Sequence, residues 1–158
     1  MSEAKHEATS FLVEWTGHYV RNRDMVAKKI VTIISRTDSL LVTYKDKETV
    51  YLARPLLENP AEIGDNTCFV TLNNKQNIEF VHKNWKEAVK YPQFSVIFVN
   101  PFSRLDKRWI LSPSVHQRVC DEASLKQGLF SLAEGVERIT PEEFVNECKK
   151  EGQGVVSG

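Results

Sequence analysis

The chain has 158 residues, of which 41% are hydrophobic and 27% are charged, a composition typical of one folded domain and not of a disordered chain. Its 21 basic residues balance its 21 acidic ones, which excludes attachment to nucleic acid or anionic membranes through an overall basic field. Any such binding has to come from a local group of side chains.

The cysteines and the amino terminus bear on the compartment. The three cysteines are widely spaced and form no Cys-x-x-Cys pair, which argues against a zinc ribbon or a disulfide framework. The first residues lack the apolar run of a signal peptide, and no segment approaches the about 20 apolar residues that span a bilayer. We therefore expect no membrane attachment and a cytoplasmic or other reducing intracellular compartment.

The first predicted element is an amphipathic helix. From Ala4 to Val20 the apolar residues recur at helical spacing, and Gly17 followed by His18 predicts the end of the helix. The next stretch, residues 21–29, holds four basic side chains against one acidic one. It is a candidate electrostatic footprint for a phosphate backbone, with a solvated surface as the alternative.

Six segments rich in β-branched and aromatic residues are expected to be strands. The polar turn Lys45–Glu48 predicts a hairpin between the second and the third of them. The fifth is an almost unbroken apolar run, typical of a strand buried on both faces of a central sheet. For the first, a helix over residues 25–34 is the alternative. The six segments are residues 30–35, 39–44, 49–57, 67–72, 94–99 and 109–111.

Three further helices are expected, over residues 75–90, over residues 125–136 and from Thr140 onward. Thr140 is followed by proline and then by Glu143, which predicts a capping box with proline at the first helical position. These elements predict a mixed α/β domain over residues 1–150, with a central sheet flanked by helices, and a flexible tail over residues 151–158.

Two neighbouring strands carry residues that resemble a known motif. Asp38 immediately precedes the second strand, in Asp38-Ser-Leu-Leu-Val, and Leu52-Ala53-Arg54 lies in the third. With the order of elements over residues 4–137, these positions resemble the PD-(D/E)xK superfamily, the restriction-endonuclease-like fold. The resemblance implies an acidic residue and an (Asp/Glu)-x-Lys in adjacent strands that hold Mg²⁺ over the scissile phosphate. It also implies a glutamate from the opening helix, for which Glu7 and Glu14 are candidates.

The motif positions depart from that pattern. Leu52 stands where the second carboxylate is expected, and Arg54 stands where the lysine is expected. A second alignment, on Thr71-Leu72-Asn73, lacks both groups as well. Glu48 and Lys75 are the neighbouring residues that would have to replace them. The resemblance therefore predicts a degenerate member of the superfamily.

Three functional hypotheses follow. The first is a nucleic-acid-associated domain of nuclease-like fold, catalytically impaired, that contacts DNA or RNA. The second is a protein-interaction or homodimerisation module that uses an exposed sheet edge and does not bind nucleic acid. The third is an active nuclease built from Glu7, Asp38 and Glu48, and only this one requires a cofactor, Mg²⁺. The candidate nucleic-acid-binding residues are Arg21, Arg23, Lys28, Lys29, Arg54 and Lys75.

A second group of aromatic and basic residues lies further along the chain. Trp85 and Trp109 are accompanied by Arg104, Lys107 and Arg108, and such a group can stack bases while its cations meet phosphates. The alternative is that both tryptophans belong to the core, because they stand at core-facing positions of their elements.

Overall fold

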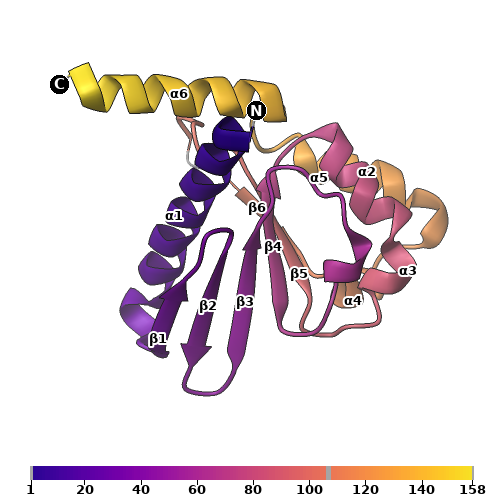
Figure 1. Ribbon diagram of the computed structural model, residues 1–158. Helices are drawn as coiled ribbons and strands as arrows, with labels where there is room; N and C mark the ends of the chain where they lie inside the picture. The colour runs from indigo at the N-terminus through magenta and orange to yellow at the C-terminus, as the bar shows by residue number, and fades with distance from the viewer. Residues whose placement is uncertain (1, 106–107, 158) are drawn as a thin grey trace.

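The computed structural model describes the backbone of residues 2–105 and 108–157 and the side chains of residues 5–105 and 108–151. It contains one mixed sheet of six strands that lie side by side in chain order (Figure 1). The strands pair antiparallel from β1 to β3, parallel from β3 to β5, and antiparallel from β5 to β6. The strands are β1 (Ile30–Ser35), β2 (Ser39–Tyr44), β3 (Glu48–Ala53), β4 (Thr67–Leu72), β5 (Ser95–Val99) and β6 (Arg108–Leu111).

Helices cover both faces of the sheet, which confirms the expected mixed α/β domain (Figure 1). On one face, α1 (Ser2–Ala27) packs on the sheet and α6 (Pro141–Ser157) crosses the amino-terminal end of α1. The opposite face carries α2 (Lys75–Lys83), α3 (Trp85–Ala88) and α5 (Leu125–Ala133), and the short α4 (Pro113–His116) contacts α3. Among the described residues, no helix is both long and apolar enough to cross a bilayer.

The opening helix is longer than the sequence predicted. It continues past Gly17 to Ala27, because Tyr19 and Val20 in its later turns are buried against the sheet. Lys28 ends it with a positive φ of 50°, and the Asp24 carboxylate accepts hydrogen bonds from the two following backbone N–H groups. The basic stretch is therefore mostly helical, and its side chains point in several directions around α1.

Most of the other predicted elements are confirmed, with different ends. β3 ends at Ala53 rather than at residue 57, and the predicted helix over residues 75–90 is broken into α2 and α3 at Asn84. The capping box is present, since Thr140 and Glu143 each accept a hydrogen bond from the other's backbone N–H. The helix α6 runs through Ser157. The flexible tail over residues 151–158 stays a prediction, because Gly158 and the side chains from residue 152 onward lie outside the described part.

The core interpretation of the two tryptophans is confirmed. Trp109 is buried and stacks on Phe98 with ring centroids 4.1 Å apart. Trp85 packs against the same core cluster and meets the edge of His116. Arg104 is exposed in the preceding loop and Lys107 lies outside the described residues, so a stacking platform on these tryptophans receives no support.

Three asparagines join β4 to its surroundings. Asn73 is fully buried, donates to the carbonyl oxygens of Ala133 and Val136, and accepts from Trp109 Nε1. Asn74 caps α2, and the Asn77 side chain binds three backbone groups, those of Pro55, Leu57 and Leu72. Because buried amides need partners, this network fixes how the helices and the loop after β3 meet the end of β4.

Cys68 in β4 provides a test of the burial of this strand. Burial raises the pKa of its thiol to about 12, from an ordinary value of 9.0. The neutral thiol therefore stabilises the fold fully below about pH 9, and this contribution is lost as the pH rises towards 12. Between pH 8 and pH 10.5 we expect the wild type to lose about 2 kcal/mol more unfolding free energy than Cys68→Ala, measured by urea denaturation. If the unfolding free energies of the two proteins changed in parallel with pH, the result would contradict the burial of the Cys68 thiol.

Candidate functional site

The sequence-predicted residues Asp38 and Arg54 lie together where β2 begins and β3 ends. Arg54 Nη1 is 3.4 Å from an Asp38 carboxylate oxygen and also donates to the Asp38 carbonyl. Its Nε and Nη2 atoms bind the Glu62 carboxylate at 3.0 and 2.6 Å. Arg54 therefore connects the β2–β3 end of the sheet to the loop that precedes β4.

This arrangement places a protein cation between two carboxylates. Burial opposes the charge of Arg54, but Glu62 and then Asp38 more than offset it, and the pKa of Arg54 is raised. A guanidinium in this position neutralises the acidic groups and occupies their lone pairs. Chemically, the cluster can hold the sheet end and its loop in place, and while Arg54 stays there the two carboxylates are engaged.

The other two candidate catalytic carboxylates are elsewhere. Glu48 pairs with Thr43 at the opposite end of β3 from Asp38. Glu7 is exposed on α1. Burial raises the pKa of Cys148 in α6 to about 11, and Glu7, Glu151 and Glu147 add to this shift. No group of three Asp, Glu, His or Cys side chains suited to a metal ion occurs among the described residues. The structure thus brings Asp38 together with Arg54 and does not bring Asp38 together with Glu48.

The candidate nucleic-acid-binding residues are also separated. Lys75 is exposed at the start of α2 and faces Glu79. Arg21 and Arg23 are about 200° apart around α1, since each helical residue turns by about 100°. Arg21 lines a pocket between α1 and the end of β1 that it shares with Glu14 and Arg36. Arg23 points to the other flank of α1.

The position of the Arg21 side chain explains why residue 17 is a glycine. A Cβ atom at Gly17 would lie 2.9 Å from Arg21 Nη1, so the guanidinium rests on the helix where a side chain would otherwise stand. Glycine inside a helix is less favourable than alanine by about 1 kcal/mol.

We therefore expect Gly17→Ala to raise the free energy of unfolding by about 0.5 to 1 kcal/mol while it moves the flexible Arg21 side chain outward. Chemical denaturation measures the effect. A lower stability in Gly17→Ala would mean that packing of the Arg21 guanidinium on Gly17 contributes more to the free energy of unfolding than helix propensity does.

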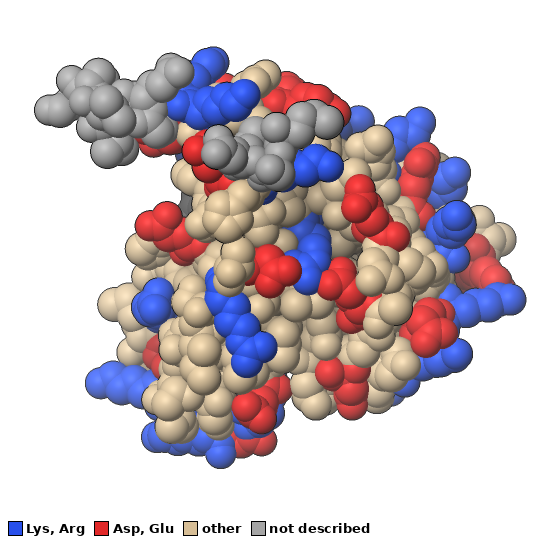
Figure 2. Space-filling model, in the orientation of Figure 1, with Lys and Arg blue, Asp and Glu red and all other residues tan. Residues whose placement is uncertain are grey.

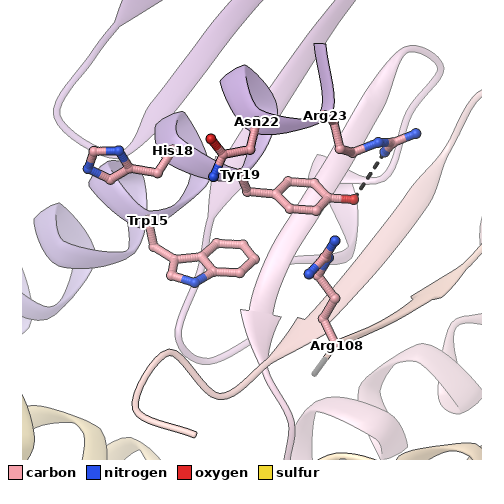
Figure 3. Close-up of a pocket in the computed structure, with 6 residues that line it drawn as sticks. All are labelled: Trp15, His18, Tyr19, Asn22, Arg23 and Arg108. Carbon is pink, nitrogen blue, oxygen red and sulfur yellow. Dashed lines mark hydrogen bonds between the residues drawn. The ribbon is translucent and has the colours of Figure 1, made fainter. Parts of the chain in front are cut away.

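The flank of α1 that carries Arg23 faces the start of β6 across an open groove of about 430 Å³ (Figure 3). We call it the α1–β6 groove. Trp15 and Tyr19, one helical turn apart, stack with their ring planes 8° apart and their centroids 5.3 Å apart. The groove is lined by Trp15, His18, Tyr19, Asn22, Arg23 and Arg108.

Two guanidinium groups converge on Tyr19 in this groove. Arg23 donates to the Tyr19 hydroxyl at 3.0 Å, and the Arg108 guanidinium carbon lies over the Tyr19 ring, 4.5 Å from its centroid (Figure 3). Neither arginine forms an ion pair with a carboxylate among the side chains that the structure describes. Burial opposes the charge of Arg23, but nearby tyrosines outweigh it and the pKa of Arg23 is raised. Both cations are therefore available to an anionic ligand.

No protein-family model, curated protein or solved structure matches this chain. On the face of the molecule shown in Figure 2, basic and acidic side chains are intermixed, in keeping with the zero net charge. Against such a surface, two arginines that pair with none of the described carboxylates, beside two stacked aromatic rings, form a distinctive local environment.

Sequence reasoning identified part of this groove. The sequence places Arg23 in the basic stretch and Arg108 next to Trp109, whereas the structure packs Arg108 against Tyr19. Trp15 and Tyr19 are among the apolar residues that recur at helical spacing between Ala4 and Val20. Their spacing of four residues next to Arg23 was the available signal, but the pairing with Arg108 joins positions 89 residues apart, which no local pattern indicates.

Proposed function

We propose that this protein binds nucleic acid through the α1–β6 groove and is impaired in cleavage. The observation that carries the proposal is the convergence of Arg23 and Arg108 on the Trp15–Tyr19 stack. Arginine forks match phosphate geometry, and aromatic side chains beside them present a surface for bases. The groove is open to solvent, so a polymer can enter it from the side.

The arrangement at the β2–β3 end supports the second half of the proposal. Asp38 immediately precedes β2 and Arg54 immediately follows the adjacent strand β3, which is close to the relation that the PD-(D/E)xK pattern requires of its leading aspartate and its lysine. Leu52, at the position of the second acidic residue of the motif, supplies no carboxylate. Arg54 forms ion pairs with Asp38 and Glu62. We propose that the chain is a degenerate member of this superfamily. In it, the Arg54 guanidinium occupies the position next to the carboxylates where an active member would bind a metal ion.

The test is binding of fluorescently labelled single-stranded DNA, duplex DNA and RNA, followed by anisotropy from about 50 to about 200 mM salt. We expect affinity to fall as salt rises. Arg108→Gln should weaken binding about five- to tenfold and flatten the salt dependence, because one phosphate contact is lost. The matched control is Lys75→Gln, which removes one exposed positive charge on the other side of the sheet and should change affinity less than about twofold.

Two outcomes would contradict the proposal. If none of the three nucleic acids binds, or if Lys75→Gln weakens binding as much as Arg108→Gln, the groove is not the site. Cleavage is assayed in the same samples with Mg²⁺, Mn²⁺ or a chelator. Cleavage that disappears with chelator and with Asp38→Ala would favour the third hypothesis, a metal-dependent nuclease with displaced catalytic groups.

A second candidate function, homodimerisation, is favoured by the free edge of β1. This strand lies at one end of the sheet and has no charged residue, proline or glycine, while Val31 and Ile34 are 59% and 49% exposed. Such an edge can pair with another strand. Light scattering over a range of concentrations tests this candidate. A dimer that Val31→Lys converts to a monomer would support it, and a wild-type monomer at every concentration would exclude it.

A further inference from the structure

A second pocket lies further along α1 and shares Arg23 with the α1–β6 groove. This α1–hairpin pocket, of about 280 Å³, lies between the last turns of α1 and the β2–β3 hairpin. Arg23 lines both pockets, so a ligand that occupies both of them would contact Arg23. The α1–hairpin pocket is lined by Val20, Arg23, Asp24, Ala27, Lys29, Tyr44, Asp46, Lys47 and Tyr51.

The second pocket repeats the chemistry of the first. Lys47 Nζ lies over the Tyr44 ring, 5.7 Å from its centroid, as Arg108 lies over Tyr19. Tyr44 is half-buried, and its hydroxyl is 2.8 Å from the Tyr51 hydroxyl. Each pocket therefore pairs an aromatic ring with a cation, and Arg23 stands between the two pairs.

The acidic residues of the second pocket do not cancel its cations. The Asp24 carboxylate is held by the backbone N–H groups of Lys29 and Ile30 at 2.8 and 3.0 Å, where it closes the end of α1. Asp46 is exposed in the hairpin turn and faces the pocket together with Lys47. Lys29, Lys47 and Arg23 outnumber the two carboxylates, so the pocket favours an anion.

We propose that the two pockets form one track for single-stranded nucleic acid, in which one base stacks beside Trp15, a base further along the strand stacks on Tyr44, and a phosphate between these bases binds Arg23. This inference rests on the proposed function and specifies its ligand. Bases in a duplex are paired and stacked on one another, whereas unpaired bases can turn outward onto recessed aromatic rings. Recessed rings flanked by cations therefore select a single strand over a duplex.

The dimensions agree with a short footprint. An α-helix rises about 1.5 Å per residue, so Trp15 and Ala27 at the two ends of the track are roughly 18 Å apart. This span suits a few nucleotides of extended strand. Shorter ligands can occupy only the α1–β6 groove, and longer ones reach Lys29 and Lys47.

The experiment uses the full chain and oligothymidylates of about two, four and eight nucleotides, with a duplex of the same length as the longest. Lys47→Gln should weaken binding of the longer oligonucleotides about three- to fivefold and leave the shortest unchanged. The matched control is Lys45→Gln, in the same turn but outside the pocket lining, which should have no effect at any length. Arg108→Gln should weaken binding at every length.

Base stacking has its own readout. The chain has three tryptophans, and quenching of their fluorescence by an oligothymidylate should be largely lost in Trp15→Phe. Circular dichroism checks that each variant is folded. Tyr44→Leu, which removes the second ring, should reproduce the length dependence of Lys47→Gln.

Three results would overturn the track: equal affinity for duplex and single strand, equal effects of Lys47→Gln and Lys45→Gln, or quenching that survives in Trp15→Phe. Each leaves binding at the α1–β6 groove intact if Arg108→Gln still weakens it. Failure of the proposed function is different, because then either no nucleic acid binds the wild type or Lys75→Gln weakens binding as much as Arg108→Gln.

Discussion

Asn73→Leu is expected to lower the free energy of unfolding by about 3 to 5 kcal/mol. Leucine is close to asparagine in shape but cannot make its hydrogen bonds. The carbonyl oxygens of Ala133 and Val136, 3.0 Å from the amide, and Trp109 Nε1, 2.8 Å away, would lose their partner in a fully buried place. Each buried polar group left without a partner costs about 1 to 3 kcal/mol.

Urea or thermal denaturation of the purified variant measures this effect. For a domain of this size we expect a fall in Tm of roughly 10 °C, because 1 kcal/mol corresponds to about 2 to 4 °C. Asn22→Leu is the control, since it makes the same replacement at an exposed position of α1 and should change stability by less than about 0.5 kcal/mol. Similar stabilities for Asn73→Leu and the wild type would show that the network does not hold β4, β6 and α5 together.

Arg54→Met is expected to lower the free energy of unfolding by about 2 kcal/mol. Methionine keeps much of the apolar length of arginine, so the loss reports the guanidinium contacts with Glu62 and Asp38. The Arg54 and Glu62 side chains are 20% and 26% exposed, which makes their pair stronger than a surface pair and weaker than a fully buried one. Arg54→Lys should recover only part of the loss, because an ammonium group cannot bind Glu62 through two parallel bonds.

The control for this prediction is Lys90→Met. Lys90 pairs with Glu87 at 2.9 Å, but both side chains are well exposed, so its loss should change stability far less than the loss of Arg54 does. Equal effects of Arg54→Met and Lys90→Met would contradict a structural role for Arg54. The cluster of Asp38, Arg54 and Glu62 would then not stabilise the fold.

The elements that could be predicted are those that depend on interactions between residues a few positions apart in the sequence. The apolar run that became β5 is buried from Val96 to Val99, as expected for a central strand. The hairpin turn before β3 and the capping box of α6 were also predicted from residues only a few positions apart. Such features depend on neighbouring side chains and on backbone preferences, which the chain order displays directly.

The extent of α1 was predicted wrongly for a tertiary reason. Gly17 is a common signal for the end of a helix, but burial of Tyr19 and Val20 against the sheet outweighs the cost of glycine inside the helix. The direction of Arg21 and Arg23 follows from this continuation. In a loop the two side chains would share one basic patch, whereas the helix sends them to opposite flanks.

The sequence by itself determined a mixed α/β domain, the strands and most of the helices, because hydrophobic spacing and capping act over a few residues. Only the tertiary structure decided the partners: Arg54 with Glu62, Asn73 with Trp109, and Arg108 with Tyr19. These pairs depend on how the sheet twists and on which helix flank faces which strand. The candidate site is made of such pairs, because a binding surface requires side chains from separate elements to meet, and their spacing along the chain does not record that meeting.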